Sequence, residues 1–139
     1  MRRQLDTQAS TAAPYEPPVR RGWVAKFGSA FRGFQRGIRG ESNFFVHLFC
    51  AAVAIAAGIV FRISAGEWAL VVLCITAVLA AEMFNTSIEA LAKAVTRDHN
   101  PWIADALDIA AGAVTLVALG AAVVGLLVFV PYLLPLFGW

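Results

Sequence analysis

Polar residues that could do chemistry recur on one helical face within an otherwise apolar stretch. Glu82, Asn85 and Glu89 are spaced i, i+3 and i+7, so at about 100° per residue they share an arc of about 60°. Thr86 and Lys93 fall on the same side, at about 40° and about 20° from Glu82. One helix is therefore expected to present two carboxylates, an amide, a hydroxyl and an ammonium group along a single line.

This set of groups is suited to binding a metal and activating a hydroxyl. Mg²⁺ is usually bound through one or two carboxylates and the phosphates of a substrate, so Glu89 with a carboxylate from another segment could hold it. Asp105 and Asp108, spaced i and i+3, supply acidic groups in the next apolar stretch. A second carboxylate kept away from the metal can act as a general base toward a hydroxyl. Glu82 lies deepest in its stretch, so we expect it to contact a lipid headgroup.

A purely structural interpretation explains the same stripe. Polar side chains on membrane helices also hold bundles together through interhelical hydrogen bonds, and Glu89 with Lys93 is a favourable i, i+4 ion pair. His47 on its own is typical of a hydrogen-bonded packing residue. Cys50 and Cys74 lie inside apolar runs, where a thiol behaves as a small hydrophobic side chain. Spacing alone therefore leaves catalysis and packing open.

The composition excludes a soluble globule. Of the 139 residues, 60% are hydrophobic and 14% are charged, and the mean hydropathy is +0.72, so there is too little polar surface to cover a core in water. A compact cytosolic enzyme, a secreted disulfide scaffold and a disordered chain are excluded on this ground. We predict an all-α membrane protein with three transmembrane helices, at about 44–63, 67–96 and 102–130, the last ended by Pro131 and Pro135.

An amphipathic interfacial helix is expected ahead of the spans, over about 22–40. Its apolar residues recur at steps of three and four, so they share an arc of about 80°. A helix of this kind lies in the headgroup layer, with its arginines toward anionic lipid or a phosphate-bearing ligand. The apolar face consists of Trp23, Phe27, Phe31, Phe34 and Ile38, and Arg32, Arg36 and Arg39 lie roughly opposite.

Charge predicts the orientation in the membrane. Eight of the eleven Lys and Arg residues lie within residues 1–40, so the positive-inside rule places this segment in the cytoplasm. The link around 62–67 is then outside and the link over 93–108 inside, which gathers the acidic residues near the cytoplasmic face. Residues 1–21 lack apolar periodicity, so we expect a disordered cytoplasmic tail, with 22–139 as one membrane domain.

Three stretches of the chain resemble the small prokaryotic diacylglycerol kinase and undecaprenol kinase family. They are Glu41-Ser-Asn-Phe-Phe-Val-His47, Ala81-Glu-Met-Phe-Asn-Thr-Ser-Ile-Glu89 and Asp108-Ile-Ala-Ala-Gly-Ala-Val114, and their order and spacing match over about residues 23–130. The resemblance implies a homotrimer of the bacterial inner membrane that transfers the γ-phosphate of MgATP to a lipid alcohol, with no nucleic-acid partner. The first stretch is more similar to the undecaprenol kinases, which favours a prenol and leaves diacylglycerol open.

Matched residue by residue, the resemblance also implies roles. Glu82 looks like the catalytic base, and Glu41 and Glu89 look like the carboxylates that bind the metal. Asn85 and Asp108 look like active-site residues that contact the nucleotide.

Two positions depart from the family pattern. The family usually has an aspartate four residues after the second motif glutamate, where this chain has Lys93. It usually has a lysine immediately before Asp108, where this chain has Leu107. Losing that lysine removes a charge that neutralises phosphate. Our hypothesis is that Lys93, on the same face as Glu89, restores a cation at the nucleotide site.

An integral membrane lipid kinase is the leading interpretation. The departures at Lys93 and Leu107 motivate a second one, a catalytically silent family member that acts as a membrane scaffold or lipid-binding protein. A small multidrug-type transporter would need acidic residues reachable from both sides, whereas this chain concentrates them near one face. The sequence contains no glycine-rich phosphate loop, kinase catalytic-loop signature or Cys/His zinc pattern.

Overall fold

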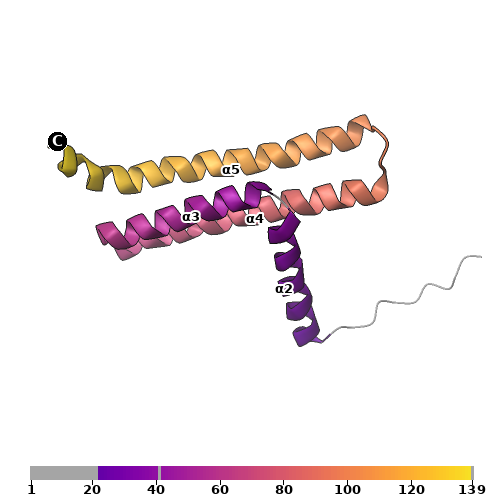
Figure 1. The fold of residues 1–139 in the computed structure, drawn as a ribbon, viewed down its shortest axis with the longest axis horizontal. Helices are drawn as coiled ribbons and strands as arrows, with labels where there is room; N and C mark the ends of the chain where they lie inside the picture. Colours follow the sequence, from indigo (N-terminus) through magenta and orange to yellow (C-terminus); the bar gives the residue numbers. More distant parts are fainter. Residues whose placement is uncertain (1–21, 41, 139) are drawn as a thin grey trace, which may run out of the picture. The chain divides into compact units, whose positions relative to one another are not determined.

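The computed structural model describes residues 22–40 and 42–138, so the expected tail over 1–21 and the candidate ligand Glu41 lie outside the described residues. Within this part of the chain every regular element is helical, which confirms the predicted all-α class (Figure 1). The elements are α2 (Trp23–Gly40), α3 (Ser42–Phe61), α4 (Ala65–Val95), α5 (Pro101–Leu133) and the short 3-10 helix η1 (Leu134–Phe137).

The chain divides into two units, residues 1–31 and residues 32–139, and α2 runs from the described part of the first into the second. The predicted amphipathic helix is confirmed, and its glycines do not interrupt it. In the first unit, Trp23 and Phe27 are 74% and 71% exposed. The Lys26 ammonium lies 4.8 Å from the centre of the Trp23 ring, a cation–π contact that keeps the charge beside the aromatic face.

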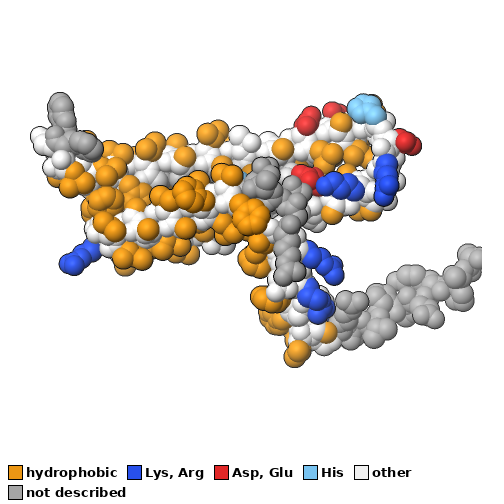
Figure 2. Space-filling view, viewed as in Figure 1, with side chains coloured by type: hydrophobic (Ala, Val, Ile, Leu, Met, Phe, Trp, Pro, Cys, Tyr) orange, Lys and Arg blue, Asp and Glu red, His pale blue; other side chains and the backbone are white. Residues whose placement is uncertain are grey.

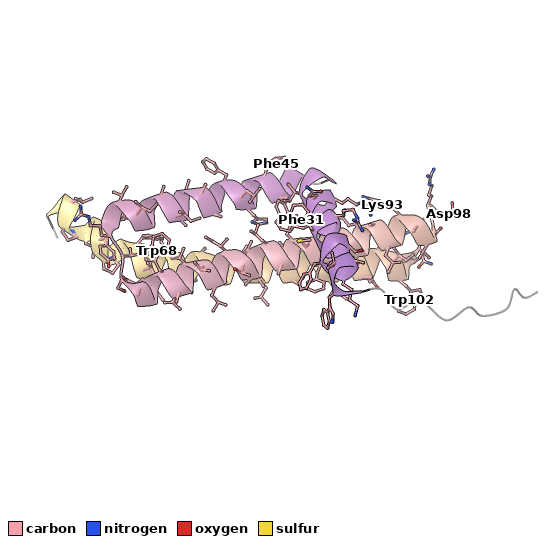
Figure 3. All side chains as sticks on the ribbon, turned by 90° about the horizontal axis from the view of Figure 1, so that it is seen from below. Phe31, Phe45, Trp68, Lys93, Asp98 and Trp102 are labelled. Carbon is pink, nitrogen blue, oxygen red and sulfur yellow. The ribbon has the colours of Figure 1, made fainter. Side chains whose placement is uncertain are left out.

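The second unit contains three long helices side by side, in which α4 runs antiparallel to both α3 and α5 (Figure 1). Each is long and apolar enough to cross a membrane. Apolar side chains cover the visible face of these helices, and charged ones gather where α4 joins α5 (Figure 2). Phe45, for example, is 62% exposed and points away from the bundle (Figure 3). Lipid is the solvent that suits such a surface.

A tight turn over residues 62–64 connects α3 to α4. Arg62 adopts a left-handed φ of 54°, and Ser64 caps α4 in a reciprocal arrangement with Glu67. The Glu67 carboxylate accepts hydrogen bonds from the Ser64 amide at 2.7 Å and from the Tyr132 hydroxyl at 2.8 Å. The end of α5 is thereby tied to the α3–α4 turn, at the opposite end of the bundle from Lys93.

The connection between α4 and α5 is also capped by side chains. Asn100 accepts hydrogen bonds from the amides of Trp102 and Ile103, and Pro101 occupies the first turn of α5, where a missing N–H costs nothing. The predicted end of the third span was wrong by one turn, because α5 continues through Pro131 to Leu133. Pro131 lacks the N–H that would bond the carbonyl four residues earlier, and α5 tolerates the loss of this bond without stopping before the proline.

Gly58 allows α3 to approach α4 closely. A Cβ atom at this position would lie 2.8 Å from the Trp68 ring and 3.1 Å from the Ile63 side chain, and the indole ring cannot bend aside. Ile63 belongs to a small buried apolar cluster with Val71 and Val128, and Trp68 packs against this cluster. Only glycine therefore fits here without moving the helices.

We expect Gly58→Val to destabilise the bundle by about 1–3 kcal/mol, because the added side chain forces overpacking against Trp68. Thermal unfolding in detergent micelles, followed by circular dichroism, measures the effect. Gly66→Ala is the matched control, since a Cβ there meets nothing within 4 Å. Equal unfolding temperatures for wild type and Gly58→Val would contradict this packing.

Candidate functional site

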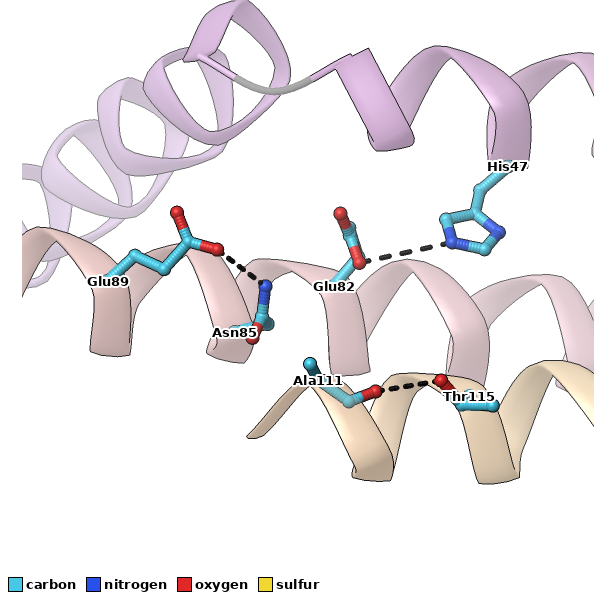
Figure 4. Close-up of polar contacts among 6 residues, drawn as sticks. All are labelled: His47, Glu82, Asn85, Glu89, Ala111 and Thr115. Atoms are coloured by element: carbon cyan, nitrogen blue, oxygen red, sulfur yellow. Dashed lines mark hydrogen bonds and ion pairs between the residues drawn. The ribbon is translucent and has the colours of Figure 1, made fainter. Parts of the chain in front are cut away.

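The polar stripe predicted on the second span is present on α4. The Asn85 side-chain amide donates a hydrogen bond to Glu89 Oε1 at 3.0 Å, and the Lys93 ammonium donates to Glu89 Oε2 at 3.5 Å (Figure 4 shows the first of these). Exposure rises along the stripe, since Glu82 is 2% exposed whereas the Lys93 side chain is 73% exposed. The stripe thus connects a buried carboxylate with an exposed cation.

Glu82 is the most unusual residue of the stripe. Its Oε2 lies 3.9 Å from His47 Nε2 on α3 (Figure 4), and its Oε1 is buried and has no hydrogen-bond partner among the described residues. A buried carboxylate oxygen without a donor is costly. Such an atom is therefore available to a ligand that carries its own donor, such as a hydroxyl group.

The proximity of His47 to Glu82 was missed by the sequence analysis, which treated His47 as a packing residue. The order of the helices along the chain could have indicated this proximity. His47 and Glu82 lie at similar distances from the α3–α4 turn, within about one helical turn of each other. In an antiparallel hairpin, residues at similar distances from the turn face each other.

A groove of about 400 Å³ opens beside Glu82. One wall is polar and comes from α3 and α4, whereas the other comes from α5 and is largely apolar. The Thr115 hydroxyl on the α5 wall donates to the Ala111 carbonyl at 3.0 Å (Figure 4). The groove therefore offers a polar end and an apolar side to one ligand. Its lining residues are His47, Glu82, Asn85, Ala111, Val114, Thr115, Ala118 and Leu119.

A second, more open pocket of about 570 Å³ lies at the α4–α5 connection. Its lining includes the cations of Lys93 and Arg97 together with His99 and Asp98, and Lys93 and Asp98 lie at this end of the bundle in Figure 3. Lys93 and Leu107 line the same pocket. Positions 93 and 107 therefore border the same space.

Asp105 and Asp108 are not joined to the stripe by side-chain contacts within the described part of the chain. Asp105 and Asp108 are exposed, and neither makes a hydrogen bond or ion pair to Glu89 within the described part of the chain. Among those same residues there is no group of three His, Cys, Asp or Glu side chains close enough to hold a metal ion. Glu41 lies outside the described residues, so its expected role stays a prediction.

The donor set of the stripe nevertheless fits Mg²⁺ carried by a nucleotide. Glu89 is partly exposed, at 28%, and its carboxylate engages only Asn85 and Lys93 on its own helix. Mg²⁺ in nucleotide sites needs one or two protein carboxylates, since phosphates and water complete its octahedron. The side of the Glu89 carboxylate that faces neither Asn85 nor Lys93 can therefore supply the protein ligand that Mg²⁺ needs.

Comparisons with known proteins assign a family to this architecture. The model of the prokaryotic diacylglycerol kinase family matches residues 28–129. Undecaprenol kinase of Bacillus subtilis (strain 168) is 36% identical over 107 residues, which cover 77% of this chain and 87% of that protein. Diacylglycerol kinase of Synechocystis sp. (strain PCC 6803) is 30% identical over 114 residues, which cover 81% of this chain and 65% of that protein. No solved structure matched the chain significantly.

Proposed function

Because the chain belongs to the prokaryotic diacylglycerol kinase family, we propose that this membrane lipid kinase transfers the γ-phosphate of ATP to the hydroxyl of a lipid alcohol. The observation that carries the proposal is the buried Oε1 of Glu82, which has no hydrogen-bond partner among the described residues and lies beside a groove with a polar end and an apolar side. The greater coverage of the relative named undecaprenol kinase favours a prenol as the alcohol, with diacylglycerol as the second candidate.

Glu82 acts as the general base in this proposal. The alcohol donates a hydrogen bond to Glu82 Oε1, and its oxygen attacks the γ-phosphorus in line with the bond to the leaving oxygen of ADP. As the new O–P bond forms and the old one breaks, the hydroxyl proton passes to Glu82. Positioned proton acceptors of this kind contribute about 10²- to 10⁴-fold to rates. His47 lies 3.9 Å from Oε2, beyond direct hydrogen-bond distance, and flanks the carboxylate on the side away from Oε1.

The nucleotide is proposed to lie between Glu82 and the pocket at the α4–α5 connection. Glu89 and Glu41 would hold Mg²⁺, which when bound neutralises charge on the phosphate oxygens. Asn85 fixes the orientation of Glu89 through its 3.0 Å hydrogen bond, and Asp108 contacts the nucleotide. Lys93 stands at the edge of the pocket, where an ammonium group attracts phosphate.

The site is proposed to face the cytoplasm, where ATP is available. The basic residues of α2 support this orientation through the positive-inside rule, and the N-terminus is proposed to lie on the same side of the bacterial inner membrane. A homotrimer would let neighbouring chains add acidic groups to a stripe that carries only two carboxylates of its own. It would also cover part of the exposed apolar surface of α3–α5.

We expect Lys93→Ala to lower kcat/KM for ATP by about 10- to 100-fold, because a charge-assisted contact to phosphate is worth about 1.5–3 kcal/mol. Arg97→Ala is the matched control, since Arg97 lines the same pocket but makes no contact with Glu89. Steady-state kinetics with varied ATP separate the two variants. Equal losses would eliminate Lys93 as the replacement cation.

The kinase proposal is tested against a catalytically silent scaffold by a panel of lipid alcohols. The purified chain is incubated in mixed micelles with Mg²⁺ and ATP labelled at the γ-phosphate, together with undecaprenol, a shorter prenol or diacylglycerol. We expect label in the organic phase, most strongly with a prenol, and its loss when Mg²⁺ is chelated. Absence of labelled lipid with every alcohol would favour the scaffold.

A further inference from the structure

An apolar groove of about 340 Å³ runs between the three long helices, beyond the polar stripe. Half of its lining consists of small residues, such as Ala121 and Gly125 on α5 and the two cysteines, Cys50 on α3 and Cys74 on α4. Small residues keep the groove open where larger ones would fill it. Except for His47 at one end, the groups assigned to phosphoryl transfer do not line this groove.

The groove adjoins the candidate site. His47 and Ala118 line both the apolar groove and the pocket that contains Glu82. From this shared end the lining on α5 runs from Ala118 to Phe129, which at 1.5 Å per residue is about 16 Å. Polarity is confined to the end at His47, so the combined space matches an amphiphile with its hydroxyl at Glu82.

The far end of the groove is closed by aromatic rings. Phe129 packs against Phe61 with ring centres 6.4 Å apart, and Phe61 stacks on Tyr132 at 5.9 Å. The groove spans roughly half of the about 30 Å hydrocarbon core of a bilayer. Because Phe61 is the last residue of α3, the far end lies beside the α3–α4 turn, and a longer chain would have to leave the groove sideways into the lipid.

Resting on the proposed function, we infer that this groove binds one hydrocarbon chain of the lipid alcohol and so selects single-chain alcohols. One apolar groove adjoins the pocket of Glu82 within the described part of the chain, so a prenol can place the part of its chain next to the hydroxyl inside it. A two-chain glycerolipid must leave one chain outside against bulk lipid. The alternative occupant of the groove is a helix of a second copy of the chain. Such a helix would cover Glu82 Oε1 and need not supply a hydrogen-bond donor to it.

The kinetic test fills the groove from α5. Ala121→Phe projects a ring into the groove, whereas Val123→Phe on the same helix is the matched control, because Val123 is 56% exposed and does not line the groove. Ala121→Phe should raise KM for a long prenol by about tenfold, since about two buried CH₂ groups are worth that factor. KM for a short, water-soluble alcohol should change less than about twofold. Equal effects on both alcohols, or an effect on neither, would overturn the inference.

The binding test needs no phosphoryl transfer. In a Cys50→Ala background Cys74 is the sole thiol, and its alkylation by N-ethylmaleimide is followed in lipid nanodiscs. We expect a long prenol to slow alkylation about fivefold or more and a short alcohol to leave it unchanged. Protection without phosphorylation of any alcohol would refute the kinase proposal and leave the groove assignment standing. The groove assignment is refuted if the prenol does not slow the alkylation of Cys74. It is also refuted if Cys74 is unreactive without prenol because a second copy of the chain covers it.

Discussion

Glu82→Gln should lower kcat for lipid phosphorylation by about 10²- to 10⁴-fold, because the amide cannot accept the proton of the attacking hydroxyl. The substitution conserves shape, and Oε1 of Glu82 makes no hydrogen bond that the variant would lose among the described residues. We therefore expect little effect on folding. The affinity for MgATP should also change little, because the carboxylate contacts the alcohol rather than the nucleotide.

Two measurements separate this role from a structural one. Initial rates of labelled phosphate transfer give kcat, and equilibrium binding of a fluorescent ATP analogue gives the affinity for nucleotide. Glu67→Gln is the control, since it makes the same chemical change at the opposite end of the bundle, beside Tyr132. A Glu82→Gln enzyme with wild-type kcat would exclude Glu82 as the base.

Glu89→Gln should lower kcat/KM for MgATP by about 10²- to 10³-fold, the size typical of losing one group that stabilises transition-state charge. Glu89 is the carboxylate that Asn85 and Lys93 both orient, through contacts of 3.0 and 3.5 Å. A neutral amide in its place binds Mg²⁺ poorly. The concentration of Mg²⁺ needed for half-maximal rate should therefore rise together with the loss of activity.

Mn²⁺ in place of Mg²⁺ provides a direct readout of this role. Binding of Mn²⁺ in the presence of ATP, followed by electron paramagnetic resonance, should weaken in Glu89→Gln and remain unchanged in Glu82→Gln. Asp105→Asn is a suitable control, because Asp105 is exposed and lacks an ion pair within the described chain. Undiminished Mn²⁺ binding by Glu89→Gln would contradict a metal-binding role for Glu89.

Local periodicity predicted those parts of the structure that depend on a single helix. The spacing of Glu82, Asn85, Glu89 and Lys93 is enough to place them in one stripe, because helix geometry fixes the angle between residues. The hydrogen bonds within the stripe follow from the same geometry. Apolar runs identified the three long helices in the same way, to within a few residues at each end.

Relations between helices could not be read from periodicity. The contact between His47 and Glu82 depends on how α3 and α4 pack, and the close approach at Gly58 depends on the position of the Trp68 ring. The sequence also could not indicate that α5 continues past Pro131. Periodicity was enough to place the candidate site residues in one stripe. The grooves beside them could not be predicted, because their shape depends on how three helices pack.

An experimental structure with Mg²⁺, a non-hydrolysable ATP analogue and a prenol would test the proposed mechanism most directly. The decisive measurement is the distance from Glu82 Oε1 to the alcohol oxygen. We predict a hydrogen bond of about 2.6–3.2 Å, with Glu89 on the metal and the prenol chain between α3 and α5. An alcohol bound away from Glu82, or carboxylates of α4 that leave no room for a triphosphate, would contradict the proposed mechanism.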